Sequence, residues 1–135
     1  MPQPTPARAP GCRVVVSDDN DDARTSLALL LSFEGHQTHE APNGARAVDV
    51  ANHVRPDVAL IDIGLPDMSG YDVAKRIRTK LNERIVLVAV TGYGQPEDQR
   101  RAFDAGFDAH LVKPITVDQL NETFATAIRG APVAP

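Results

Sequence analysis

The sequence predicts an α/β fold in which helices cover both faces of a parallel five-stranded sheet. Two observations lead to this prediction. Five short apolar runs alternate with segments whose apolar residues recur at helical spacing, and this pattern is typical of a parallel sheet joined by helices. The chain has 135 residues without an internal linker or repeat, which is the size of one ordinary domain.

Five strands are expected. The first is a run of β-branched residues (RVVVS), which suits a strand buried on both faces. The second is short and polar, as expected at the edge of a sheet, and the fourth (IVLVAV) is the most hydrophobic. The strands are predicted at residues 13–17, 36–41, 57–61, 85–90 and 108–112.

Five helices are expected between and after the strands. Ser69 and Thr116 suit helix N-caps, Pro96 suits a first helical turn and Gly106 suits a helix end. A Pro-Asn-Gly turn at residues 42–44 precedes a short helix that contains Ala47, Val48 and Ala51. The other helices are predicted at residues 22–34, with Ala23, Leu27, Leu30 and Leu31 on one face, at 71–81, at 96–105, and after Thr116, with Val117, Leu120, Phe124 and Ile128 on one face.

The two ends of the chain differ from its middle. Residues 1–11 hold four prolines and residues 130–135 read GAPVAP, so both ends are predicted to be disordered and the domain to span residues 12–129. The net charge of -4 argues against non-specific nucleic-acid binding. No apolar run approaches the roughly 20 residues of a membrane span, and no secretory signal is recognisable. The cytoplasm is the expected location, and the single cysteine, Cys12, is expected to be an inert thiol.

Polar residues gather where the predicted strands end. In open parallel sheets the functional crevice lies beyond the carboxyl ends of the strands, where we expect Asp18, Asp19, Asp62, Thr91 and Lys113. Three carboxylates repel one another, so a divalent cation is expected beside the lysine, and hard oxygen ligands favour Mg²⁺. A carboxylate nucleophile, a metal, a lysine and a hydroxyl are the groups needed for phosphoryl transfer onto aspartate.

Four segments of the chain together resemble the signature regions of bacterial response-regulator receiver domains. They are VVVSDDN, ALIDIGLPDMSGYDV, VAVTGYG and HLVKPI, and the resemblance runs from about residue 13 to residue 129. It implies a flavodoxin-like doubly wound fold with strand order 2-1-3-4-5. It also implies a place in a two-component phosphorelay, with a histidine kinase or a histidine phosphotransfer protein as partner. Residues 91–115 look most like receivers attached to hybrid sensor histidine kinases.

The resemblance implies a role for each residue at the strand ends. Asp62 is the phosphoryl acceptor, Asp19 binds Mg²⁺ directly and Asp18 often acts through water. Thr91 follows the phosphoryl group on activation, and Lys113 pairs with it. The protein would catalyse only its own phosphorylation and dephosphorylation, and it is expected to be a monomer or a weak dimer.

Three further positions follow from the same resemblance. The backbone carbonyl of Gly64 is the third protein ligand of Mg²⁺, and the peptide bond before Pro114 is usually cis. His110 departs from the family, because receivers commonly carry Tyr or Phe three residues before the lysine that corresponds to Lys113. A histidine is smaller and its charge depends on pH, so we expect a weak or pH-dependent switch.

The sequence fits other functions less well. A haloacid-dehalogenase-type phosphatase needs a second acid two residues after the nucleophile, where this chain has Gly64, and a flavin carrier would not place an acidic loop against a phosphate. A pseudo-receiver that only binds partners remains the main alternative, although the intact acids, Thr91 and Lys113 speak against it. Asp21 and Asp22 are expected at a helix start, and three other histidines lack metal-ligand spacing and are expected at the surface, namely His36, His39 and His53.

Overall fold

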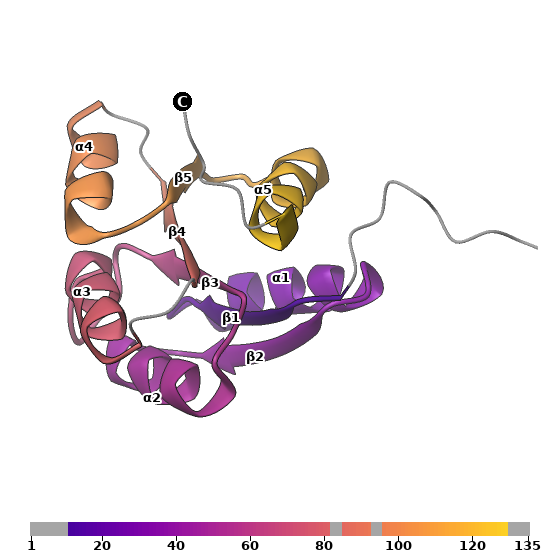
Figure 1. Ribbon diagram of the computed structural model, residues 1–135, viewed down its shortest axis with the longest axis horizontal. Helices are drawn as coiled ribbons and strands as arrows, with labels where there is room; N and C mark the ends of the chain where they lie inside the picture. The colour runs from indigo at the N-terminus through magenta and orange to yellow at the C-terminus, as the bar shows by residue number, and fades with distance from the viewer. Residues whose placement is uncertain (1–10, 82–84, 93–95, 130–135) are drawn as a thin grey trace, which may run out of the picture.

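A computed structural model describes residues 11–81, 85–92 and 96–129, without the side chains of residues 96 and 126–129. The disorder predicted for residues 1–11 and 130–135 concerns segments outside these ranges, apart from Gly11. Five strands form one parallel sheet in the order β2-β1-β3-β4-β5, as predicted (Figure 1). Their bounds are β1 Arg13–Ser17, β2 Gln37–Ala41, β3 Val58–Asp62, β4 Val86–Thr91 and β5 Ala109–Val112.

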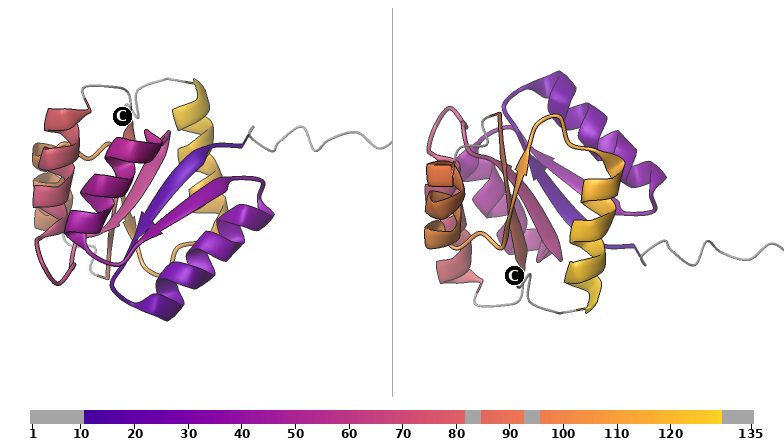
Figure 2. Two further views of the ribbon diagram at one scale, coloured as in Figure 1. Left: turned by 90° about the horizontal axis from the view of Figure 1, so that it is seen from below. Right: turned by 90° about the horizontal axis from the view of Figure 1, so that it is seen from above.

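Five helices cover the two faces of the sheet. Helices α1 and α5 lie on one face, and α2, α3 and α4 lie on the other (Figure 2). Their bounds are α1 Asp21–Phe33, α2 Gly44–Val54, α3 Gly70–Lys80, α4 Pro96–Ala105 and α5 Val117–Arg129. No helix in the described part of the chain is long and apolar enough to cross a membrane.

The alternation of side chains along the strands divides the core into two clusters. On β1, Val15 packs toward α2, α3 and α4, whereas Val14 and Val16 pack toward α1 and α5. All three valines are at most 1% exposed, so β1 is buried on both faces as its β-branched sequence predicts. The polar strand β2 lies at the edge of the sheet.

The predicted helix caps are confirmed, with small shifts of the helix ends. The Ser69 side chain accepts a hydrogen bond from the Asp72 amide, and Thr116 and Gln119 each accept from the other's amide in a capping box. Gly106 follows α4 with φ +108°, a left-handed conformation that glycine adopts without strain. Helix α1 begins one residue earlier than predicted because Asn20 caps it.

The prediction that His36 lies at the surface is wrong. Its side chain is buried, Nδ1 accepts a hydrogen bond from the Cys12 amide at 3.0 Å, and its ring contacts the edge of Phe124. The absence of metal-ligand spacing around His36 argues against a metal-binding role, but it does not predict whether the side chain is buried. Cys12 is buried beside it, and burial, followed by the charge of Asp57, raises the pKa of the thiol to about 11, which agrees with an inert cysteine.

Two smaller corrections concern the surface. On α1, Ala23 is exposed although it was placed on the apolar face, and Ala28 takes its place in the core. His39 is half-buried rather than at the surface, and its Nε2 is covered without a hydrogen-bond partner among the described residues. His53 is exposed as predicted.

Candidate functional site

The carboxyl ends of the strands bring the predicted polar residues to one edge of the sheet. Asp18 and Asp19 follow β1, Asp62 is the last residue of β3, Thr91 is the last residue of β4, and Lys113 follows β5. All five strands are parallel, so these residues meet although they come from four separate parts of the chain.

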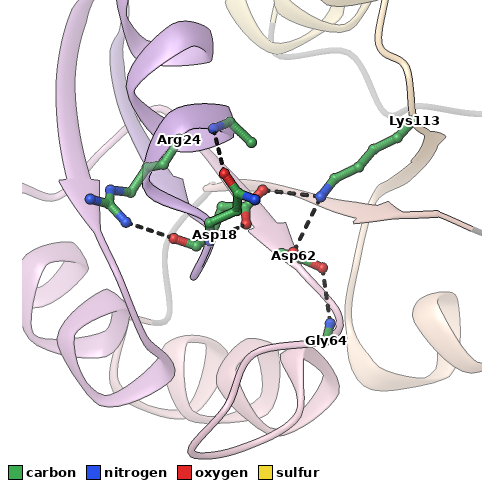
Figure 3. A network of polar contacts seen from close by, with 7 residues as sticks. Asp18, Arg24, Asp62, Gly64 and Lys113 are labelled. Atoms are coloured by element: carbon green, nitrogen blue, oxygen red, sulfur yellow. Dashed lines mark hydrogen bonds and ion pairs between the residues drawn. The ribbon is translucent and has the colours of Figure 1, made fainter.

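Three carboxylates and one lysine form the centre of the site. Oxygen atoms of Asp18, Asp19 and Asp62 lie within 4.8 Å of one another. The Lys113 ammonium donates to Asp18 Oδ2 at 3.0 Å and to Asp62 Oδ2 at 3.3 Å, so one cation bridges two of the three acids (Figure 3). Asp18 is buried, Asp62 is half-buried and Asp19 is exposed.

The loop after β1 is held by residues that were not predicted as part of the site. The Asn20 amide donates to Asp18 Oδ1 at 2.9 Å. The Arg24 guanidinium donates to the Asp18 backbone carbonyl at 2.9 Å (Figure 3). Arg24 also pairs with Asp21 and with Glu40 on β2. Arg24 therefore connects the acidic loop to α1 and to the edge strand β2. The only signal of this in the sequence is that Arg24 lies a few residues after the acids.

The loop after β3 begins with a tight turn around Asp62. The Gly64 amide donates to Asp62 Oδ1 at 2.9 Å, so Gly64 lies beside the carboxylate (Figure 3). The loop closes where the Gly70 amide donates to the Ile63 carbonyl at 2.9 Å. A Cβ atom on Gly70 would lie 2.7 Å from Ile63 Cα, so this closure requires glycine.

The crowded charges shift the pKa values of two groups. Burial raises the pKa of Asp62, and the charge of Asp18 adds to this, while the Gly64 amide and Lys113 oppose it. Burial lowers the pKa of Lys113, but its hydrogen bonds and charge interactions with Asp18 and Asp62 outweigh burial and raise it. Lys113 therefore stays charged, and one lysine does not fully offset the burial and repulsion that Asp62 experiences.

Thr91 and His110 lie at different distances from the cluster. Thr91 is buried at the end of β4, and its carbonyl accepts from the Lys113 amide at 2.8 Å, which places it at the same edge. His110 lies within β5, paired in register with Ala89, and is not part of the cluster. Both ring nitrogens of His110 are covered without a hydrogen-bond partner among the described residues. Burial lowers its pKa, against a smaller opposite effect of Asp98.

The donor set of the cluster fits a hard divalent cation. Three carboxylates within 4.8 Å of one another supply oxygen ligands and an excess of negative charge over the single lysine. Mg²⁺ suits such a site because it binds through a few carboxylates and keeps several waters.

The peptide bond between Lys113 and Pro114 is cis, the isomer implied by the resemblance.

The fold and the site together define a class of protein. A doubly wound sheet of order 2-1-3-4-5 with acids, a hydroxyl and a lysine at its carboxyl edge is a flavodoxin-like domain equipped for chemistry at a carboxylate. A sequence model of the family described as "Response regulator receiver domain" matches residues 14–125. The chain belongs to this family, and it is a receiver domain of the two-component response regulators.

Relatives and solved structures agree with this assignment. Sporulation initiation phosphotransferase F of Bacillus subtilis is 30% identical over 110 residues, which cover 82% of this chain and 88% of that protein. Sensor histidine kinase RcsC of Salmonella typhi is 35% identical over 112 residues, covering 83% of this chain but 12% of that protein. The crystal structure of a CheY-like receiver domain protein from Methanospirillum hungatei has a TM-score of 0.81 at 26% identity, covering 90% of this chain and 95% of that one.

Proposed function

We propose that this receiver accepts a phosphoryl group on Asp62 from a phosphohistidine of a histidine kinase or a histidine phosphotransfer protein. A carboxylate oxygen of Asp62 attacks phosphorus, the P–N bond to the donor imidazole breaks, and the imidazole leaves with the bonding electron pair. The observation that carries the proposal is the Lys113 bridge, 3.0 Å from Asp18 and 3.3 Å from Asp62. A positive charge so close to Asp62 would stabilise the negative charge on the transferring oxygens.

The same cluster would hold Mg²⁺. Asp19 and Asp62 would bind it directly, Asp18 through water, and Gly64 through its backbone carbonyl. When bound, the metal would neutralise charge on the transferring oxygens. The Thr91 hydroxyl would then donate to the new phosphoryl group, and Lys113 would turn from its two carboxylate partners toward a phosphoryl oxygen.

The donor would dock over a cavity of about 610 Å³ between α1 and the loop after β5. Its lining is mostly apolar and includes Leu27 and Leu30 of α1 and Ile115 of the loop, while Asp18 and Lys113 belong to both the cavity and the acidic cluster. We propose that an apolar side chain of the helix carrying the phosphohistidine enters this cavity. The shared residues support this occupant, because the donor must reach Asp62 from a neighbouring surface.

Phosphorylation would alter the surface formed by α4, β5 and α5. An aspartyl phosphate adds charge and acceptor oxygens, which Thr91 and Lys113 would transmit to β5. His110 would make this switch weak or dependent on pH, so phosphorylation-linked shifts should differ between the parent and His110→Tyr at acid and neutral pH. We further propose that the receiver acts in the cytoplasm, as a monomer or a weak dimer, without nucleic-acid binding or a separate enzymatic activity of its own.

Incubation with acetyl phosphate and Mg²⁺, followed by mass mapping of the modified peptide, tests the proposal. The parent should gain one phosphoryl group on Asp62. The Asp62→Asn variant should gain none, because an amide oxygen is a poor nucleophile. Labelling of that variant at the parent's rate would refute Asp62 as the acceptor, and a parent that never labels would favour a pseudo-receiver.

A further inference from the structure

The loop between β3 and α3 carries Gly64 and is fixed at more than one point. At its neck, the Ile63 amide donates to the Val90 carbonyl at 3.0 Å, and the Gly70 amide donates back to the Ile63 carbonyl. Leu65 packs into the core on the side of α2, α3 and α4. These contacts hold the two ends of the loop, and its tip is held by a different residue, Asp67.

Asp67 joins the tip of this loop to the start of α2. Its Oδ1 accepts from the Gly44 amide at 2.7 Å and its Oδ2 accepts from the Ala45 amide at 2.9 Å. Amides in the first turn of a helix have no partner within the helix, and a carboxylate there also meets the positive end of the helix dipole. The hydrogen bonds from Ala45 and Gly44 accordingly lower the pKa of Asp67.

The contact between loop and helix is also close-packed. A Cβ atom added to Gly44 would lie 2.4 Å from Met68 Cγ and 2.9 Å from Val73 Cγ2. Position 44 therefore has room for glycine alone unless the loop moves away. The helix already has its own cap, since Asn43 accepts from the Arg46 amide, so the Asp67 contact is an addition that connects two separate parts of the chain.

We propose that Asp67 is a positioning residue for the cation at the phosphoryl-accepting site. Asp67 lies three residues after Gly64, whose amide already donates to Asp62 Oδ1 at 2.9 Å. By fixing the loop on α2, Asp67 holds Gly64 beside Asp62 before a metal binds, so metal binding need not order the loop. This inference rests on the proposed function, and it adds a residue outside the cluster that sets how tightly the cluster holds Mg²⁺.

The test is isothermal titration calorimetry of the full chain with Mg²⁺ alone, which measures the dissociation constant of the cation. In Asp67→Ala the dissociation constant should rise by about tenfold, the low end of what loss of a residue supporting metal ligands costs. Asp67→Asn keeps one acceptor oxygen and should fall between Asp67→Ala and the parent. Asp49→Asn is the matched control, because it removes the same charge from an exposed position on α2, and its constant should stay within about twofold of the parent's since salt screens exposed charges.

Two further measurements separate positioning from a general structural role. Hydrogen exchange at the Gly44 and Ala45 amides should accelerate in Asp67→Ala, which reports directly on the lost contact. Labelling by acetyl phosphate should be slower than in the parent at low Mg²⁺ and equal to it at saturating Mg²⁺. Thermal melting checks that Asp67→Ala is folded. If it is not folded, Asp67→Asn is compared with the parent in its place.

The outcomes distinguish this inference from the proposed function. Equal Mg²⁺ affinity in Asp67→Ala and Asp49→Asn, together with faster exchange at Gly44, would overturn the positioning role and leave Asp67 as a cap of α2. A labelling rate that stays low at saturating Mg²⁺ would overturn it too. A parent chain that binds no Mg²⁺ would overturn the proposed metal site itself, and the inference with it.

Discussion

Replacement of His110 by phenylalanine is expected to stabilise the protein. Both ring nitrogens of His110 are covered and have no hydrogen-bond partner among the described residues, and an unpaired buried polar group costs about 1–3 kcal/mol. His110 as a whole is only half-buried, so we apply the penalty to one nitrogen only and take the lower part of this range. Phenylalanine keeps a planar ring and has no polar side-chain atoms, and the free energy of unfolding should rise by about 1–2 kcal/mol.

The gain should depend on pH in a defined direction. Burial lowers the pKa of His110 in the folded chain, so between that value and the ordinary histidine pKa of about 6.5 the unfolded chain binds more protons than the folded one. The parent therefore loses stability as the pH falls through about 6.5, and His110→Phe lacks this loss. The other three of the four histidines are present in both proteins, so their titration cancels in the comparison.

Urea denaturation followed by circular dichroism at pH 8 and pH 5.5 measures both effects. The stability difference between His110→Phe and the parent should be larger at the lower pH. His53→Phe serves as the control, because His53 is exposed on α2 and such surface changes stay within about 0.5 kcal/mol. A phenylalanine variant no more stable than the parent, or a gain that is equal at both pH values, would refute the reasoning.

Three other predictions concern the framework and the charges. Arg78→Ala should lower the free energy of unfolding by about 2–4 kcal/mol in urea denaturation, because Arg78 donates to the Ile85 and Gly106 carbonyls and pairs with Asp108. Gly70→Ala should lower the free energy of unfolding by more than about 1 kcal/mol, because its Cβ atom would meet the Ile63 backbone. Urea denaturation measures this loss as well. Mg²⁺ at about 100 times its dissociation constant should add about 2.7 kcal/mol to the free energy of unfolding, which thermal melts detect. This gain should shrink at pH 4, because the pKa of Asp62 is raised and its carboxylate becomes protonated.

Each of these predictions has an outcome that would contradict it. Arg76→Ala changes an exposed arginine on α3 and should have little effect, so an equal loss in both arginine variants would contradict the specific role of Arg78. Normal stability of Gly70→Ala would show that the loop neck can widen. A Mg²⁺ gain that is unchanged in Asp62→Asn would place the cation away from the cluster.

The fold and the centre of the site could be predicted from the sequence because their signals are local and repeated. Apolar runs and helical spacing fixed five strands and five helices, and the parallel arrangement then placed Asp62 and Lys113 at one edge. The supporting contacts could not be predicted in the same way. Asp67 contacts Gly44 across 23 positions, and nothing in the sequence near either residue indicates that they meet.

Burial of polar groups was the other feature that sequence patterns missed. His36 sits in the turn between α1 and β2, where a polar residue is ordinarily exposed, but here its ring packs on Phe124 of α5. That contact depends on how α5 returns to the sheet beside β1, almost 90 residues later in the chain. Helical and strand periodicities describe which face of an element is apolar, whereas they do not report contacts made by residues between elements.

The charge balance of the site supports both the proposed metal and the proposed phosphoryl transfer. In the described structure one lysine serves two acids, and burial together with Asp18 still raises the pKa of Asp62. A divalent cation bound there would reduce the remaining repulsion, and it would thereby favour the ionised form of Asp62, the proposed nucleophile. Phosphorylation of Asp62 would then weaken the pairing of Lys113 with Asp18, because the phosphoryl oxygens would compete with Asp18 for the same ammonium. Lys113 directly follows β5 and its amide donates to the Thr91 carbonyl at the end of β4, so a shift of Lys113 would act on both strands. On the proposed function, the signal would leave the site along β5, the strand that also carries His110.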